Sequence, residues 1–345
     1  MLINRVLIVG LGSIGKRHLF FAREQIPNAD IRVLRHKVSK DLPQYSNGCF
    51  FSIEDAIQFA PQIAVIANPA SHHISIAKKL AEIGVHLLIE KPLSNNLNGV
   101  SELIEICQKQ NSCLLTGYNL RYLPSLKYFR ELIGENIIGN VLSVNCEVGQ
   151  YLPSWRSDSN YHQGVSAKRE LGGGALLELS HEIDYLRWIF GEVKWVKASL
   201  SQQSALEIDV EDTVNIIMCF MPSSSRHKLI ASVNLDFIRH DTSRLCTAIG
   251  ETGSLRWNGI TGEVSIYKSD SKDWCQLYSY KHQRDESYLA EWKDFLSCVT
   301  KNKTPLITGD DGLKVLQIIE AIRKASVSDG IMLDEVILQT SKVVK

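Results

Sequence analysis

The sequence lacks any hydrophobic run that approaches the roughly 18 to 20 residues needed to span a bilayer. Its start, residues 1–5, also lacks the layout of a secretory signal peptide. Both absences argue against a membrane-spanning or exported protein. We therefore expect a cytoplasmic protein with no membrane partner.

Net charge is lacking as well, because Lys+Arg and Asp+Glu each number 38. Nucleic acids and anionic membranes both favour a basic protein face, so we expect neither of them as the main partner. The 345 residues are enough for two domains with separate cores.

The eight cysteines are scattered, and no C-x-x-C motif occurs among them. This spacing supports neither a zinc site nor a disulfide framework. We therefore predict no metal site and regard most of the cysteines as small core residues. Internal repeats, low-complexity tracts and long linkers are also absent from the sequence.

A glycine motif is present between a predicted strand, residues 6–9, and a predicted helix, residues 14–26. Gly10 permits a tight turn, Gly12 lets the backbone approach a pyrophosphate, and Gly15 allows the helix to pack closely on the strand. The motif predicts a dinucleotide site, with an adenosylmethionine site as the main alternative. The predicted cofactor contacts here are Gly10, Gly12, Ser13, Ile14 and Gly15.

The next predicted strand ends in Arg35 and His36, where many NAD-binding proteins carry an acid for the ribose 2′-hydroxyl. Basic side chains suit a 2′-phosphate, so we predict NAD(P) as the cofactor with a preference for NADP. The alternative is that both side chains are solvated at a strand end.

Strand and helix signals alternate over residues 1–120, which predicts an α/β Rossmann domain with a parallel sheet. Residues 121–345 instead show consecutive strand signals with short turns and two late helices. We predict a C-terminal α+β domain with a mostly antiparallel open sheet, a single helix over residues 175–189, and C-terminal helices able to pack back on the first domain.

Two further segments follow predicted buried strands, at the sheet edge where α/β proteins bind ligands. One is Glu90-Lys91-Pro92, in which a desolvated lysine can be tuned for proton transfer and the proline stiffens the turn. The other runs from Asn68-Pro69 to His73, in which Ser71 could cap the next helix. A histidine in that first turn either contacts the cofactor or faces water.

Gly172-Gly173-Gly174 precedes a helix that carries His181 and Asp184 one turn apart. The glycines let the backbone pass close to a ligand. Histidine with a neighbouring carboxylate is a plausible general acid or base whose partner orients the ring. Taken alone, such a pair also fits a solvated helix face.

These motifs, together with Gly117-Tyr118-Asn119-Leu120-Arg121-Tyr122 and the pattern from Pro305 through Asp311 to Ala321, resemble the glucose–fructose oxidoreductase, inositol dehydrogenase and rhizopine-catabolism (Gfo/Idh/MocA) family. The resemblance covers nearly the whole chain. Two positions depart from its common pattern: Asn68 replaces a frequent threonine, and Glu178 replaces a frequent aspartate.

The resemblance implies roles for matching positions. Lys91 would contact the substrate hydroxyl and the nicotinamide ribose, His181 would be the catalytic histidine, and Asp184 would assist it. Asn119 and Arg121 would line the active site. The cofactor contacts predicted from these segments are Asn68, Pro69, His73, Glu90, Lys91 and Asn119.

A loop rich in aromatic and basic side chains covers residues 150–171. Aromatic faces suit sugar rings, and guanidinium groups suit carboxylates or phosphates. We predict an activated or acidic sugar as substrate, although an interface loop would have the same composition. The predicted substrate contacts are Arg121, Tyr151, Trp155, Arg156, Tyr161 and Arg169.

The sequence thus predicts an NAD(P)-dependent oxidoreductase that transfers a hydride between the nicotinamide and a secondary alcohol or ketone of a sugar-like substrate. Alternatives are a nicotinamide-dependent glycosidase of the same fold, a reductase of a non-sugar substrate, and a non-catalytic dinucleotide- or sugar-binding protein. The open sheet invites burial against another copy, so we expect a homodimer or homotetramer.

Overall fold

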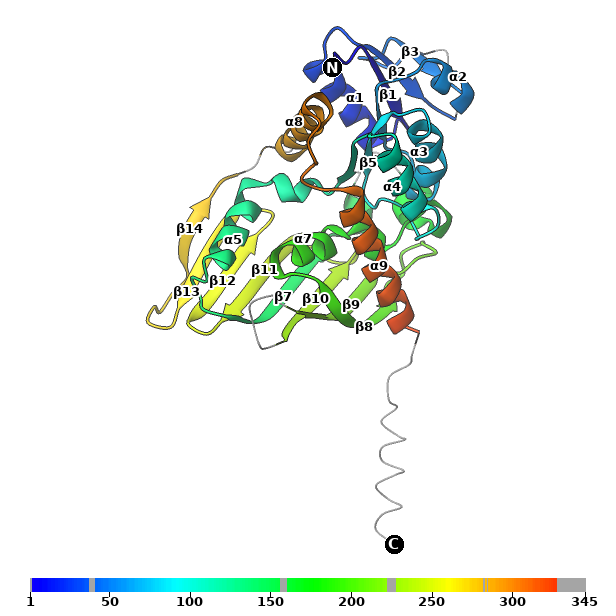
Figure 1. Cartoon of the computed structure of the whole chain (residues 1–345). Helices are drawn as coiled ribbons and strands as arrows, with labels where there is room; N and C mark the ends of the chain where they lie inside the picture. The colour runs from blue at the N-terminus through cyan, green and yellow to red at the C-terminus, as the bar shows by residue number, and fades with distance from the viewer. Residues whose placement is uncertain are drawn as a thin grey trace.

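Two β-sheets organise the chain in the computed structural model, which describes residues 2–36, 41–155, 160–221, 228–281, 283 and 285–327 (Figure 1). The first sheet is parallel, with strand order β3-β2-β1-β4-β5-β6. Its strands are β1 (Arg5–Val9), β2 (Asp30–Leu34), β3 (Gly48–Phe50), β4 (Ile63–Ile66), β5 (His86–Glu90) and β6 (Leu114–Gly117).

Helices connect these strands and bury both faces of the sheet, which explains why β4 is apolar and buried at every position. Ser52 caps α2 by accepting from the Asp55 amide, as its sequence context predicts. Strand β3 was not predicted, because three half-buried residues give too short a pattern. The helices are α1 (Ser13–Gln25), α2 (Ile53–Gln58), α3 (His73–Ala81) and α4 (Val100–Lys109).

The second sheet has strand order β14-β13-β12-β11-β7-β10-β9-β8. Within it β10 and β7 run parallel and the other neighbours run antiparallel, which confirms the predicted fold class. The strands are β7 (Val141–Gly149), β8 (Val193–Ser201), β9 (Thr213–Phe220), β10 (Leu229–Asp236), β11 (Ser243–Gly250), β12 (Gly253–Asn258), β13 (Glu263–Lys268) and β14 (Cys275–Ser279).

One face of this sheet is covered by α5 (Pro124–Gly134), α7 (His181–Phe190) and α9 (Gly309–Ala325), as Figure 1 shows. The single helix predicted over residues 175–189 is wrong, because the chain forms α6 (Ala175–Glu178) and α7 with a break at Leu179 and Ser180. The break frees the Glu178 carbonyl from helical bonding, and Lys91 uses it instead.

The last two helices return the chain to earlier parts of the fold. Helix α8 (Glu286–Lys301) packs Trp292, Phe295 and Val299 into a core shared with β1. Helix α9 contacts β8 and α7 and begins with a capping box between Thr308 and Asp311. Among the described residues, the helices are all too short or too polar to cross a membrane.

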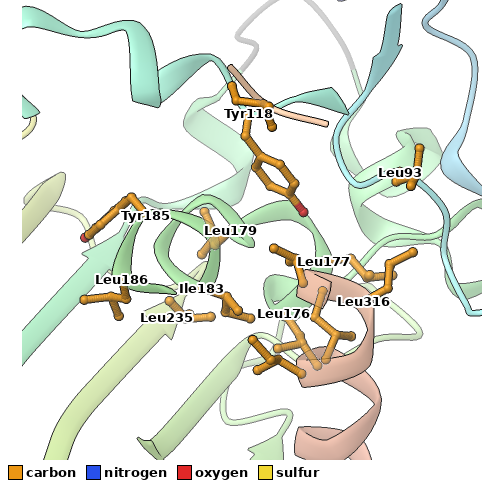
Figure 2. Close-up of a cluster of buried hydrophobic side chains, with 14 of the residues drawn as sticks. Leu93, Tyr118, Leu176, Leu177, Leu179, Ile183, Tyr185, Leu186, Leu235 and Leu316 are labelled. Atoms are coloured by element: carbon orange, nitrogen blue, oxygen red, sulfur yellow. The ribbon is translucent and has the colours of Figure 1, made fainter. Parts of the chain in front are cut away.

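A buried apolar cluster fixes the break between α6 and α7 (Figure 2). Leu177 and Leu179 lie in it with Tyr118, which follows β6, and Leu316 of α9. These side chains are at most 5% exposed, so the cluster is a packed core that joins the first domain to the helical layer of the second.

Candidate active site

The glycine turn after β1 has the geometry that the sequence predicts. Gly10 has φ of +88°, and a Cβ there would lie 2.8 Å from the Ala67 carbonyl oxygen. A Cβ on Gly15 would lie 2.2 Å from the Gly10 oxygen, whereas one on Gly12 would meet no atom within 4 Å. Helix α1 starts beside this open space without a side-chain cap, so its first amides and positive dipole end suit a phosphate.

Two buried polar atoms near this turn, Asn68 Oδ1 and Ser71 Oγ, have no hydrogen-bond partner among the residues that the structure describes. Both lie in the loop that follows β4. Ser71 does not cap α3 as predicted, since the residue at that position is His72 and no side-chain bond forms. Unpaired buried polar atoms are costly, and a dinucleotide bound at this edge would satisfy them.

His73 was predicted to contact the cofactor, but the structure gives it another role. Its ring is 1% exposed and lies 2.8 Å from the Asn68 carbonyl oxygen and 3.1 Å from that of Pro92. Burial lowers its pKa, so the neutral ring donates to one of the two oxygens. His73 therefore joins the two ligand-edge loops instead of facing a ligand.

Arg35 and His36 directly follow β2, with His36 exposed and an Arg35 guanidinium nitrogen 3.4 Å from the Asp41 carbonyl oxygen. Both lie at the carboxyl edge of the sheet, on the strand next to the glycine turn. Residues 37–40 lie outside the described part of the chain.

Glu90 and Asn119 were also predicted to contact the cofactor, and both side chains are engaged within the protein. Glu90 accepts from His18 Nε2 at 2.7 Å and from the Lys91 amide at 3.1 Å. Asn119 donates to Ser287 Oγ at 2.9 Å. Through these bonds Glu90 supports the backbone of Lys91, and Asn119 connects the segment after β6 to α8.

A tryptophan of α8, Trp292, determines which ring nitrogen of a neutral His18 carries the proton. Trp292 Nε1 donates to His18 Nδ1 at 2.9 Å, so the proton of a neutral ring lies on Nε2. This N–H donates a hydrogen bond to Glu90. Glu291 lies beside this pair, fully buried, and neither of its oxygens has a hydrogen-bond partner in the part of the chain that the structure describes. Burial and the nearby Glu90 charge raise the pKa of Glu291 well above its usual value, which favours its neutral form.

Ligand atoms of His18, Glu90 and Glu291 lie within 4.8 Å of one another, close enough to be examined as a metal site. A metal-bound histidine normally donates its other ring N–H to an acceptor. Here His18 Nδ1 accepts from Trp292, and Nε2 donates to Glu90. The arrangement therefore reads as a hydrogen-bond chain that ends at the Lys91 backbone.

Lys91 crosses from the first domain to the second. Its Nζ donates to the Glu178 carbonyl oxygen at 2.7 Å and lies 3.3 Å from Glu178 Oε2. The other Glu178 oxygen accepts from Ser166 at 2.8 Å. Glu178 was noted only as a departure from the family pattern, and its position just before a helix break gave no sign that it would hold Lys91.

His181 is the first residue of α7 and lies against Tyr118, with ring centroids 5.6 Å apart. Its Nδ1 has no hydrogen-bond partner among the described residues. Burial lowers its pKa well below the usual value, and the positive charges of Lys91 and Arg244 lower it further. The ring is therefore neutral at neutral pH and able to accept a proton.

Asp184 does not orient the His181 ring in this structure. Its carboxylate accepts two bonds from Arg121, at 2.9 and 2.6 Å, and burial raises its pKa to about 6. Arg121, 2% exposed, also reaches Asp311 at 3.5 Å, so it is not open to substrate as predicted. The pair ties the segment after β6 to α7, one turn below His181.

A second buried ion pair lies next to His181 and was missed by the sequence analysis. Arg244 Nε donates to Glu182 Oε1 at 2.8 Å, while Glu182 Oε2 has no partner. Arg244 comes from β11, whose ordinary strand pattern carries no motif. Only the tertiary structure brings it to α7.

The predicted substrate loop is partly engaged with its surroundings. Tyr151 stacks on His240 with centroids 4.1 Å apart, and Trp155 packs edge-on against Phe237. Arg169 donates to the Asp209 carbonyl oxygen at 2.9 Å. The Tyr161 hydroxyl accepts from the Glu207 amide at 3.3 Å. The predicted contact Arg156 lies outside the described residues.

The fold and the site define an oxidoreductase built on an NAD-binding Rossmann domain. Two family profiles match the chain: the NAD-binding Rossmann fold of the Gfo/Idh/MocA oxidoreductases over residues 4–118, and their C-terminal alpha/beta domain over residues 130–332. The chain belongs to the Gfo/Idh/MocA family, as the sequence motifs indicate.

Individual relatives are distant. An uncharacterized oxidoreductase of Synechocystis sp. is 33% identical over 141 residues, 41% of this chain and 37% of that protein. Myo-inositol 2-dehydrogenase of Thermotoga maritima is 25% identical over 354 residues, 96% of this chain and 99% of that protein. Four curated relatives, the Synechocystis protein among them, are matched over only part of their length. The chain spans 35% to 61% of each of these four proteins.

Solved structures show the same fold. Levoglucosan dehydrogenase in complex with NADH has a TM-score of 0.81 at 21% identity, covering 94% of this chain and 97% of that one. The WlbA dehydrogenase from Bordetella pertussis, in complex with NADH and UDP-GlcNAcA, has a TM-score of 0.75 at 21% identity, covering 94% and 96%.

Proposed function

We propose that the protein is a dehydrogenase or reductase that uses a nicotinamide dinucleotide to interconvert a secondary alcohol and a ketone on a sugar-like molecule. The observation that carries the proposal is the meeting of Lys91, from the end of β5, with the α6–α7 segment that bears His181. The Rossmann domain supplies Lys91 at the carboxyl edge of its parallel sheet, and the second domain supplies His181.

The glycine turn fits the cofactor, because Gly12 faces open space and the start of α1 has no side-chain cap. We propose that this turn, with Ser13, Ile14, and the loop of Asn68 and Pro69, holds the dinucleotide. The bound nicotinamide supplies the hydride acceptor or donor.

The protein's own residues handle the proton. Neutral His181 accepts the proton of the substrate hydroxyl during oxidation and returns it during reduction. Lys91 Nζ has three N–H donors, of which two are used by Glu178, and the third is available to the substrate oxygen. An ammonium at that oxygen stabilises the negative charge that develops there.

Substitution of each group tests the proposal. We expect Lys91→Met and His181→Ala each to lower kcat by about 100-fold or more, with the dinucleotide still bound, because each removes one partner in proton transfer. Turnover is followed as NAD(P)H absorbance, and binding as NAD(P)H fluorescence. Lys79→Met, an exposed lysine of α3, is the matched control. Full turnover by either site variant would contradict the assignment.

For the choice of cofactor we propose NADP, supported by two basic residues, Arg35 and His36, directly after β2. The double variant Arg35→Asp/His36→Asn is expected to lower kcat/KM for NADP(H) and to spare NAD(H). Equal loss with both cofactors, or a clear preference of the native protein for NAD(H), would contradict it.

For the substrate we propose a sugar or sugar derivative. For the assembly we propose a homodimer or homotetramer through the second sheet, and we propose that the protein is cytoplasmic. Support for the substrate comes from the aromatic loop around Tyr151 and Trp155, and from relatives whose names refer to inositol and levoglucosan. Support for the assembly comes from the uncovered sheet face, which has a groove of about 740 Å³.

A further inference from the structure

Arg244 has an unused pair of donors. Its Nε bonds Glu182 Oε1 at 2.8 Å, and Nη1 and Nη2 have no hydrogen-bond or ion-pair partner among the described residues. The side chain is 20% exposed, so it is neither a surface arginine nor a sealed one. An arginine held at Nε by one carboxylate keeps its outer edge available for a second, bidentate partner.

The position of Arg244 is fixed from several sides. Its backbone oxygen accepts from Gly259 at 2.8 Å, and a Cβ on Gly259 would lie 2.7 Å from the Arg244 Cδ, so the stem packs against that glycine. Glu182, which anchors the guanidinium, is fully buried in the first turn of α7. A side chain held this way is oriented before any ligand arrives.

Arg244 also faces the proposed reaction centre. Its charge, together with that of Lys91, acts on His181, the residue before its anchor Glu182. In the sheet, Arg244 pairs with Val148 at the end of β7, and the aromatic loop begins just after that strand. The backbone of Arg244 therefore lies beside the strand that leads into the predicted substrate loop, and its side chain bonds the residue that follows the proposed base.

We propose that Arg244 binds a carboxylate on the substrate, which makes the substrate class an acidic sugar, such as a uronic acid. This inference rests on the proposed dehydrogenase function and names its substrate class. Two parallel N–H donors match the two oxygens of a carboxylate.

Paired substrates test the proposal. Glucuronate and galacturonate are compared with glucose and galactose, and UDP-glucuronic acid with UDP-glucose, by kcat/KM under saturating cofactor. We expect the native protein to prefer the acid of at least one pair. Arg244→Gln should lower the ratio of acid to neutral kcat/KM by about 10- to 100-fold, chiefly through KM, as a charged hydrogen-bonded pair is lost.

Two further variants separate binding from folding. Arg244→Lys keeps the charge without the bidentate edge and should fall between the native protein and Arg244→Gln. Arg239→Gln, an arginine at the β10–β11 connection that pairs with Glu147, should leave the ratio unchanged. Thermal unfolding of each variant checks that it is folded.

Failure of the carboxylate site and failure of the proposed dehydrogenase function give different results. Equal loss on acidic and neutral sugars, or a native preference for the neutral partner in every pair, overturns the carboxylate site while turnover itself upholds the dehydrogenase. Absence of turnover on every sugar counts against the proposed function. In that event calorimetry decides the site: glucuronate binding that Arg244→Gln abolishes supports it, and no binding, or binding unaffected by the substitution, overturns it.

Discussion

His181 shows how burial sets a residue's chemistry. The ring lies at the start of α7, against Tyr118 and near two cations, and its buried Nδ1 has no partner. Burial, and after it the charges of Lys91 and Arg244, disfavour the protonated ring. The same histidine on an exposed helix face would be half-charged near pH 6.5.

This environment predicts the acid limb of the pH profile. Because His181 acts as a base only when neutral, and its pKa is lowered, kcat/KM for alcohol oxidation should persist below pH 6.5. The measurement is kcat/KM from pH 4.5 to 8 with saturating cofactor. A limb centred at or above 6.5 would show that the ring is solvated or that another group is the base.

At the scale of elements, α8 completes the first domain from the other end of the chain. Trp292 places a donor on His18, His18 donates to Glu90, and Glu90 accepts the Lys91 amide. Glu291, one residue before Trp292, is buried next to this chain without a partner. Helix α8, which supports Lys91, thus contains a buried carboxyl group, Glu291, that costs folding free energy. A neutral side chain at this position would remove that cost.

Glu291→Gln should stabilise the protein at neutral pH. The folded-state pKa of Glu291 is raised above its usual 4.5, so its contribution to stability is present below about pH 4.5 and is lost as pH rises towards the folded pKa. The variant lacks this loss. Its gain in unfolding free energy over the native protein should therefore grow above pH 4.5, by at most about 1.4 kcal/mol per pH unit.

Urea unfolding of both proteins at pH 5, 6, 7 and 8 measures this gain. Glu131→Gln, an exposed glutamate of α5, is the control for substitution at the surface. A gain that shrinks as pH rises would mean that Glu291 is ionised in the folded protein.

At the scale of the whole molecule, the second sheet has one face under helices and one face without them (Figure 1). The uncovered face is mostly polar, but Ile217 is 43% exposed and Trp195 and Ile249 are each 37% exposed. Apolar groups on an eight-stranded surface favour burial against a second sheet.

Ile217→Lys should therefore weaken self-association by placing a charge on that face, on β9 next to the edge strand β8. Light scattering after size exclusion, over a range of micromolar concentrations, gives the mass of each species. Ile83→Lys, an equally exposed isoleucine after α3, should leave the mass unchanged. A monomeric native protein, or an unchanged mass of Ile217→Lys, would contradict assembly through this face.

The sequence by itself determined most of the elements and the glycine turn, because both depend on local patterns. Consecutive strand signals predicted the mostly antiparallel sheet that β7 to β14 form, and the spacing of Gly10, Gly12 and Gly15 is a property of one turn. The same motifs carried the family assignment. Lys91 and His181 were predicted as site residues because each belongs to such a motif.

The tertiary structure decided which side chains can still contact a ligand and which are bonded within the protein. Arg121 and Asp184 became a buried pair, Glu90 and His73 became supports, and Arg244 was brought from β11 to the site. Apart from the His73 contacts, these outcomes depend on residues far apart in the chain, 62 positions for Arg244 and Glu182 and 63 for Arg121 and Asp184. Local patterns carry no information about such pairs, since burial and hydrogen bonding are settled only when the elements pack.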